Sequence, residues 1–179
     1  MNVLVAGGAG FIGSNLVDAL LAEGHHVACI DNFYIGTRAN IAHLEHEKNF
    51  TFYQEDLANL DQVIEIFKKE APAYVFHMAA NSDIQASAEA PLVEHKNTYT
   101  TTFNVLEAMR VCGTKNLFFC STSAVYGDAM GREVNEGYAP LMPISYYGAC
   151  KLGCEGLISA FTYMLSLIHI SEPTRHSLI

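Results

Sequence analysis

The chain has 179 residues, half of them hydrophobic, which is enough for one domain with a core but too few for two full domains. Acidic residues outnumber basic residues 19 to 10, and the resulting net charge of -9 does not favour binding to nucleic acid or to an anionic membrane surface. The five cysteines include no CxxC pair and predict reduced thiols rather than a metal site. We therefore expect a cytoplasmic protein that binds a small molecule.

The N-terminal part of the chain has the pattern of a strand, a helix and a second strand. An apolar run at 2–6 is followed by GGAGFIG at Gly7–Gly13, by apolar residues at helical spacing up to Gly24, and by a second apolar run at 27–31. The glycines allow a tight turn, and they let a pyrophosphate approach the free N–H groups at the start of the helix. Asp31 ends the second run at the position of a ribose-binding carboxylate, which would repel a 2′-phosphate. The pattern predicts a dinucleotide site that prefers NAD to NADP.

The rest of the chain continues the alternation of strands and helices. Apolar runs predict strands at 50–53, 74–78 and 116–121, and helical patterns occupy 57–70 and 91–112. Such alternation is typical of a parallel sheet with helices on both faces. The expected fold class is α/β, a doubly wound parallel sheet of the Rossmann type with strand order 3-2-1-4-5-6.

A tyrosine and a lysine lie four residues apart in the C-terminal part of the chain. Tyr147 and Lys151 occupy one face of a helix that is expected to begin near Ser145. A free tyrosine titrates near pH 10 and is a poor base at neutral pH. A nearby ammonium group, together with the positive nicotinamide ring of bound NAD, would stabilise the phenolate and lower the pKa of the tyrosine. The pair therefore predicts a general base and its electrostatic partner.

Together these motifs resemble the extended short-chain dehydrogenases of the NAD-dependent epimerase/dehydratase family. The matching segments cover nearly all of residues 1–164 and are GGAGFIG at 7–13, DN at 31–32, DL at 56–57, HMAA at 77–80, STSAVYG at 121–127 and YGACK at 147–151. The resemblance implies a pyrophosphate held by backbone amides, an adenine edge held at residues 56 and 57, and a cleft lined by two alanines. The cofactor-binding residues that it implies are Gly7, Gly10, Phe11, Ile12, Gly13, Asp31, Asn32, Asp56, Leu57, Ala79, Ala80, Tyr147 and Lys151.

The resemblance also implies a reaction. Tyr147 would take the proton from the 4′-hydroxyl of a nucleotide sugar while hydride passes from C4′ to NAD, and Lys151 would hold the nicotinamide ribose. The hydroxyl of Thr122 would bond the reacting sugar oxygen, and Ser123 is the other expected substrate contact. The 4-keto sugar would then turn over and take the hydride back on its other face, so that no second substrate and no metal is required.

Two residues after Thr122 favour one branch of the family. Dehydratases of the family carry Asp-Glu there and decarboxylases keep a Glu, whereas this chain has Ser123 and Ala124. Without those carboxylates the elimination of water lacks its proton donor and acceptor. We therefore expect a nucleotide-sugar epimerase of the UDP-glucose 4-epimerase type that acts on a UDP-hexose and is homodimeric at full length. A uronate epimerase, a decarboxylase, a dehydratase and a non-catalytic NAD-binding protein remain alternatives.

The C-terminal residues have a different character. The segment LSLIHISEPTR at 165–175 matches, residue for residue, the translation of a transposase-type sequencing adapter. We therefore expect a truncated NAD-binding domain at 1–164, ending before its last strands and the substrate-binding region, and a non-native tail at 165–179. The tail is not expected to supply a strand beside 116–121, because Pro173 would block pairing.

Overall fold

The computed structural model describes residues 1–131, 133–165 and 168–170. In this part of the chain a parallel sheet has the strand order β3-β2-β1-β4-β5-β6, which confirms the predicted order. Each predicted strand is present, with ends that differ by at most two residues from the expected ones. The strands are β1 (Asn2–Ala6), β2 (His26–Ile30), β3 (Phe50–Tyr53), β4 (Tyr74–His77), β5 (Asn116–Phe119) and β6 (Ile168–Ile170).

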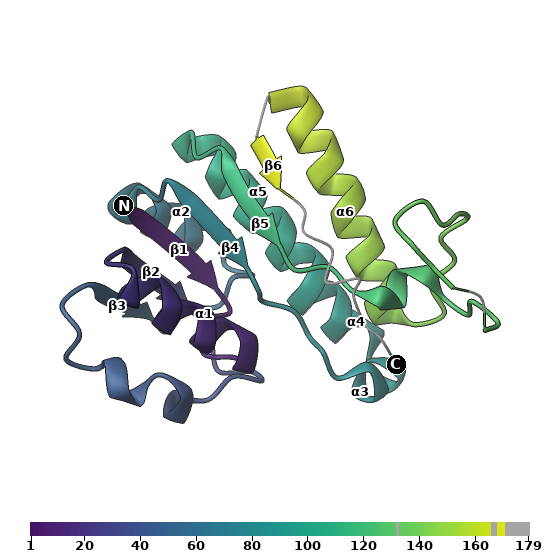
Figure 1. Cartoon of the computed structure of the whole chain (residues 1–179), viewed down its shortest axis with the longest axis horizontal. Coiled ribbons are helices and arrows are strands. Elements are labelled where there is room, and N and C mark those ends of the chain that lie inside the picture. The colour runs from purple at the N-terminus through teal and green to yellow at the C-terminus, as the bar shows by residue number, and fades with distance from the viewer. Residues whose placement is uncertain (132, 166–167, 171–179) are drawn as a thin grey trace.

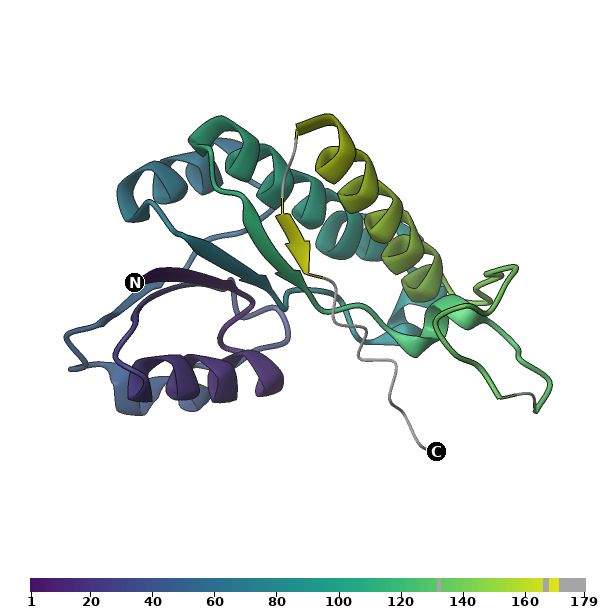
Figure 2. The ribbon, with the colours of Figure 1, turned by 45° about the horizontal axis from the view of Figure 1, so that its top comes forward.

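Helices cover both faces of this sheet, as the alternating pattern predicts. One face carries α1, and the opposite face carries α2, α5 and α6 (Figures 1 and 2). The helices are α1 (Phe11–Ala22), α2 (Leu60–Glu70), α3 (Ile84–Glu89), α4 (Pro91–Glu94), α5 (Thr101–Cys112) and α6 (Tyr146–Leu165). Short 3-10 turns occupy Arg38–Asn40, Ala42–Leu44 and Ser123–Tyr126.

The sheet separates two apolar clusters. Phe67, Met109 and Ile158 belong to the cluster under α2, α5 and α6, and Val5 and Val17 belong to the cluster under α1. All five side chains are almost fully buried, and each contributes roughly 1.5–3 kcal/mol to folding by leaving water. The two clusters hold β1 and β4 rigidly in the centre of the sheet, where the candidate site begins.

The predicted helix at 91–112 contains an irregular middle. α4 runs into a π-helical segment, His95–Thr100, which continues as α5. The hydroxyl of Thr101 donates to the carbonyl oxygens of Asn97, at 2.8 Å, and of Thr98, and the hydroxyl of Thr102 also donates to the carbonyl oxygen of Thr98. Threonine bonds of this kind to the preceding turn favour local distortion of a helix. The threonine-rich sequence therefore widens the helix by one residue at this point.

The expectation that the C-terminal tail supplies no strand is wrong for its first part. Ile168–Ile170 forms β6 and pairs in parallel with β5, opposite Asn116–Phe118. Parallel pairing uses backbone groups, and a short segment with β-branched residues satisfies them at a sheet edge. Pro173, on which the expectation rested, lies outside the described residues, and α6 crosses the expected boundary by one residue, to Leu165.

Candidate active site

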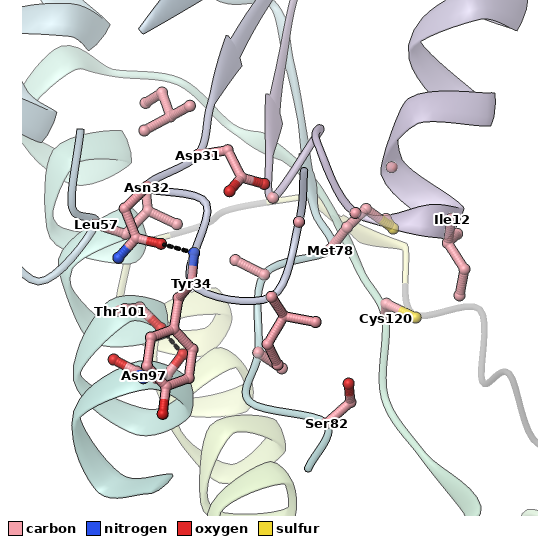
Figure 3. Close-up of a pocket in the computed structure, with 18 of the residues that line it drawn as sticks. Ile12, Asp31, Asn32, Tyr34, Leu57, Met78, Ser82, Asn97, Thr101 and Cys120 are labelled. Carbon is pink, nitrogen blue, oxygen red and sulfur yellow. Dashed lines mark hydrogen bonds between the residues drawn. The ribbon is translucent and has the colours of Figure 1, made fainter. Parts of the chain in front are cut away.

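A cavity of about 340 Å³ lies at the carboxyl ends of the strands, where the strand order reverses between β1 and β4. Ligands of doubly wound sheets bind at this point. Figure 3 shows the side chains that surround this cavity. They come from the ends of β2, β4 and β5, from the start of α1, and from the π-helical segment and the start of α5. The structure brings every residue predicted to bind the cofactor to this cavity, namely Gly7, Gly10, Phe11, Ile12, Gly13, Asp31, Asn32, Asp56, Leu57, Ala79, Ala80, Tyr147 and Lys151.

The glycine turn is packed too tightly for side chains. Gly7 has a φ of +84°, and a Cβ on it would lie 2.6 Å from the backbone nitrogen of Ala79. A Cβ on Gly13 would collide with the carbonyl oxygen of Gly7. Phe11 and Ile12, which lie between Gly10 and Gly13 in the first turn of α1, are apolar yet exposed, with 83% and 58% of their surface accessible. This first turn has N–H groups without helical acceptors, so it offers them to an anion in the cavity.

Asp31 is buried at the end of β2 and fixes two loops. Its Oδ2 accepts a hydrogen bond from the amide of Ala9 at 3.0 Å, and its Oδ1 accepts one from the amide of Phe33 at 2.8 Å. Phe33 has a φ of +60°, which turns the chain sharply after β2. The carboxylate therefore joins the glycine turn to the loop after β2 and keeps further lone pairs for hydroxyl donors.

Asp56 and Leu57 line the cavity after β3. Oδ1 of Asp56 accepts from the amide of Ala58 at 2.9 Å, and Oδ2 accepts from Nζ of Lys96 at 2.8 Å. Partial burial raises the pKa of Asp56, but the hydrogen bonds from Lys96 and Ala58 outweigh it, so that the net pKa is lowered. The carboxylate is therefore charged and forms an ion pair with Lys96 of the π-helical segment. This ion pair was not predicted from the sequence.

The segment after β4 forms the opposite wall. The amides of Met78 and Ala79 both donate to the carbonyl of Ala6 at the end of β1, at 2.8 and 2.9 Å. His77, just before them, is fully buried, and burial lowers its pKa to about 3. Its Nε2 lies 2.9 Å from Oγ1 of Thr102, and its Nδ1 has no partner among the described residues. The buried imidazole is therefore neutral near pH 7 and packs beside the ring of Phe119.

Tyr147 and Lys151 reach the cavity from the first turns of α6. The amide of Gly148 donates to Oγ of Ser145 at 3.0 Å, so the Ser145 side chain caps the start of α6 at the predicted place. A Cβ on Gly148 would lie 2.6 Å from the carbonyl oxygen of Ala124, so α6 begins in close contact with the turn Ser123–Tyr126.

The electrostatics of Tyr147 differ from the expected ones. Burial raises the pKa of Tyr147, and its hydrogen bond with Thr122 lowers it; the nearby Cys120, Glu94 and Cys154 raise it further. In the protein alone the net pKa is therefore raised, whereas the sequence predicts a pKa lowered by Lys151 and a bound cofactor. Burial of the hydroxyl, which a sequence pattern does not reveal, is the reason.

Lys151 is the most buried cation of the site, with 1% of its surface exposed. Its Nζ donates to the carbonyl oxygen of Cys120 at 2.7 Å and lies 4.5 Å from the ring centroid of Phe119. Burial lowers the pKa of Lys151, and nearby Cys154, Cys120, Glu94 and Glu155 oppose that change. The lysine is thus held at the end of β5, on the tyrosine side of the cavity.

Thr122 and Ser123 stand beside the cofactor cavity rather than in its described lining. Thr122 bonds Tyr147 and also accepts from the amide of Ala124 at 3.2 Å, so it caps the turn that supports α6. Ser123 is exposed.

The structure adds lining residues that sequence reasoning missed. Tyr34 and Gly36 come from the loop after β2, and Asn97 and Thr101 come from the π-helical segment and the start of α5. The four-residue spacing of Asn97 and Thr101 places them on one helix face, and this was the available signal. Their proximity to residue 31 depends on the strand order and could not be inferred from spacing.

Within the described ranges, no helix is long and apolar enough to cross a membrane. In the same part of the chain, no three His, Cys, Asp or Glu side chains are grouped so that they could hold a metal ion.

Comparison with known proteins identifies the family. The model of a family described as GDP-mannose 4,6 dehydratase matches residues 4–172. The chain belongs to this family. The predicted membership in the NAD-dependent epimerase/dehydratase group is therefore confirmed, and so is the Rossmann-type fold.

Several of the curated and solved proteins that resemble this chain are named 4-epimerases. UDP-glucose 4-epimerase of Lactobacillus helveticus is 35% identical over 89% of this chain and 46% of its own length. UDP-glucuronate 4-epimerase of Thermodesulfobacterium geofontis is 34% identical over 92% of this chain and 52% of its own length. A solved UDP-glucose 4-epimerase of Thermus thermophilus, in complex with NAD, superposes with a TM-score of 0.87 at 36% identity and covers 96% of this chain and 54% of its own. The chain spans about half the length of these relatives, and the predicted cofactor is the one in the Thermus complex.

Proposed function

We propose that this chain is the cofactor-binding half of an NAD-dependent nucleotide-sugar 4-epimerase. The observation that carries the proposal is the convergence of all the predicted cofactor residues on one cavity with Tyr147 and Lys151 at its edge. The 4-epimerases among the relatives support the reaction class, and their greater length supports a substrate-binding half outside this chain.

The residues fit NAD on three sides of the cavity. The glycine turn lets a pyrophosphate reach the N–H groups of α1, because a Cβ on Gly7 or Gly13 would meet backbone atoms. Asp31 would accept hydrogen bonds from ribose hydroxyls and would repel a 2′-phosphate. Asp56 and Leu57 lie at the end of β3, where an adenine edge would rest.

When bound, NAD supplies the acceptor and later the donor of hydride. Tyr147 takes the proton from the sugar 4′-hydroxyl and returns it when the 4-keto sugar is reduced on its other face. The Thr122 hydroxyl, already bonded to Tyr147, orients the same sugar oxygen. Lys151, held at the carbonyl of Cys120, would hold the nicotinamide ribose and supply positive charge beside the phenolate.

The family also contains dehydratases, and the matched family model carries that description. Elimination of water from a 4-keto sugar needs an acid and a base near C5′ and C6′. The two positions after Thr122 hold Ser123 and Ala124, which supply neither. The choice of epimerisation over dehydration rests on these two residues, and a UDP-hexose is the proposed substrate.

The experiment has two steps. Calorimetric titration of the 179-residue chain with NAD tests the cofactor half, and failure to bind NAD would end the proposal. Extension of the source DNA beyond the codon for Met164, followed by expression, then allows an assay for interconversion of UDP-glucose and UDP-galactose. Formation of a 4-keto-6-deoxy sugar from UDP-glucose would identify a dehydratase instead, and release of CO₂ from UDP-glucuronate in a parallel assay would identify a decarboxylase.

A further inference from the structure

Glu94, at the end of α4, is a buried carboxylate close to the Tyr147 and Lys151 pair. Its side chain has no solvent exposure. α4 packs against α6, and the charge of Glu94 acts on four groups of that helix, namely Tyr147, Cys150, Lys151 and Cys154. An ionised carboxylate is costly to bury unless hydrogen bonds replace its water. The hydrogen-bond partners of Glu94 therefore indicate its structural role.

Three polar side chains replace that water. Oε2 of Glu94 accepts from Oγ of Ser87 at 2.6 Å and from Nδ2 of Asn81 at 3.0 Å, while Oε1 accepts from the hydroxyl of Thr98. All three donors are themselves buried. The carboxylate is thus satisfied on both oxygens and fixed in direction.

These partners belong to two walls of the cavity. Asn81 directly follows Ala79 and Ala80, and its amide donates to Oγ1 of Thr98 at 3.0 Å. Thr98 belongs to the π-helical segment, which also carries the lining residue Asn97. The network therefore ties the segment after β4 to the π-helical segment directly behind the cavity, through Glu94.

We propose that Glu94 is a positioning residue of the candidate active site, which ties these two walls together and holds a fixed negative charge beside Tyr147 and Lys151. The proposal rests on the proposed function for its meaning in catalysis, but not for its test. The charge disfavours the Tyr147 phenolate and favours the Lys151 ammonium. The other groups that face Tyr147 are Cys120 at the end of β5, Cys154 on α6 and the hydroxyl of Thr122, and Glu155 also acts on Lys151.

Glu94→Gln separates the charge from the hydrogen bonds. A glutamine can accept from Asn81 and Ser87 through its oxygen and donate to Thr98 through its NH₂ group, so the wall contacts survive while the charge is lost. Glu94→Asp keeps the charge. Glu70→Gln is the matched control, because Glu70 is also a buried carboxylate that accepts a side-chain hydrogen bond, from Tyr53, but lies at the C-terminal end of α2.

The measurement is the phenolate absorbance of Tyr147 in the 179-residue chain, obtained as the difference between each variant and the same variant with Tyr147→Phe. In Glu94→Gln the Tyr147 midpoint should fall by up to about 1 pH unit, and in Glu94→Asp and Glu70→Gln it should stay within about 0.2 unit of the parent. An unchanged or higher midpoint in Glu94→Gln, or an equal fall in Glu70→Gln, would overturn the proposed role of the charge. Neither result depends on any sugar substrate.

A second variant, Thr98→Val, tests whether the network holds the two walls of the cavity together. It also keeps the proposal testable if circular dichroism shows that Glu94→Gln does not fold. Thr98→Val removes the hydroxyl that joins Glu94 to the Asn81 amide and keeps the shape of the side chain. NAD affinity by calorimetry should fall about 10-fold, the scale of one lost buried hydrogen bond. Thr100→Val on the same segment, whose hydroxyl lies on the exposed side near His95, should not change it. Equal NAD affinity in Thr98→Val and the parent would overturn the anchoring role.

Discussion

At the scale of single residues, the buried carboxylate of Asp31 is expected to set the cofactor preference. Asp31 is bonded to the amides of Ala9 and Phe33, so its charge is fixed where the ribose of a dinucleotide would lie. A 2′-phosphate placed there meets a buried negative charge. We expect the chain to bind NAD at least about 10-fold more tightly than NADP, and Asp31→Asn to reduce this preference. Calorimetric titration with both cofactors checks it, and tighter binding of NADP by the parent chain would contradict it.

Tyr147 is the proposed base. Tyr147→Phe in the extended, full-length protein should lower the epimerisation rate at least ~100-fold, the usual scale for loss of a general base, and should leave NAD binding largely intact. Tyr146→Phe is the control, since Tyr146 is the exposed neighbour on the same turn. Rates near the parent value in Tyr147→Phe would place the base elsewhere.

His77 should make the fold sensitive to acid. Its pKa is lowered by burial to about 3, against about 6.5 in an unfolded chain. Between these values the unfolded chain binds a proton that the folded chain does not, so the free energy of unfolding falls as pH drops below about 6.5 and is fully retained above it. His77→Phe, which keeps a ring beside Phe119, should reduce that loss by roughly 2–3 kcal/mol at pH 4. Urea unfolding of both proteins at pH 7 and pH 4 measures the difference, and parallel losses would exclude His77 as its source.

At the scale of elements, two features depart from the regular pattern. The π-helical segment His95–Thr100 carries Asn97, which lines the cavity, and Thr98, whose hydroxyl bonds Glu94. β6 covers the edge of β5, so the open edge expected for 116–121 is absent from the described sheet.

The β6 pairing leads to a test of solubility. His169→Pro removes a backbone donor at the position opposite Leu117 and should uncover the edge of β5, which favours association with other chains. His169→Thr keeps the donor and is the control. Size-exclusion chromatography should show larger species for the proline variant alone, and identical elution of both variants would mean that β6 does not protect the edge.

At the scale of the whole molecule, the cavity has residues for a cofactor and only an outer rim, at Thr122 and Ser123, for a substrate. We expect the 179-residue chain to bind NAD without measurable epimerase turnover, because the relatives that share its fold are about twice as long. We also propose that 165–179 is an adapter-derived tail, even though part of it pairs as β6. Turnover by the 179-residue chain on UDP-glucose would contradict the first expectation, and source DNA that encodes the same tail in an independent clone would contradict the second.

The sequence by itself predicted the strand order, the glycine turn and a large share of the residues that line the cofactor cavity, but not Tyr34, Asn97 or Thr101. The strands, the glycine turn, Asp31 and the pair Tyr147 and Lys151 follow from local patterns, namely the hydrophobic period, the glycine spacing and a shared helix face, whereas Asp56, Leu57, Ala79 and Ala80 follow from the resemblance to the family. Only the tertiary structure decided the raised pKa of Tyr147, the ion pair of Asp56 with Lys96, the strand at Ile168–Ile170 and the place of Glu94 behind the site. Burial and contacts between distant segments create these features, because the charge and hydrogen bonds of a side chain depend on what the fold brings beside it.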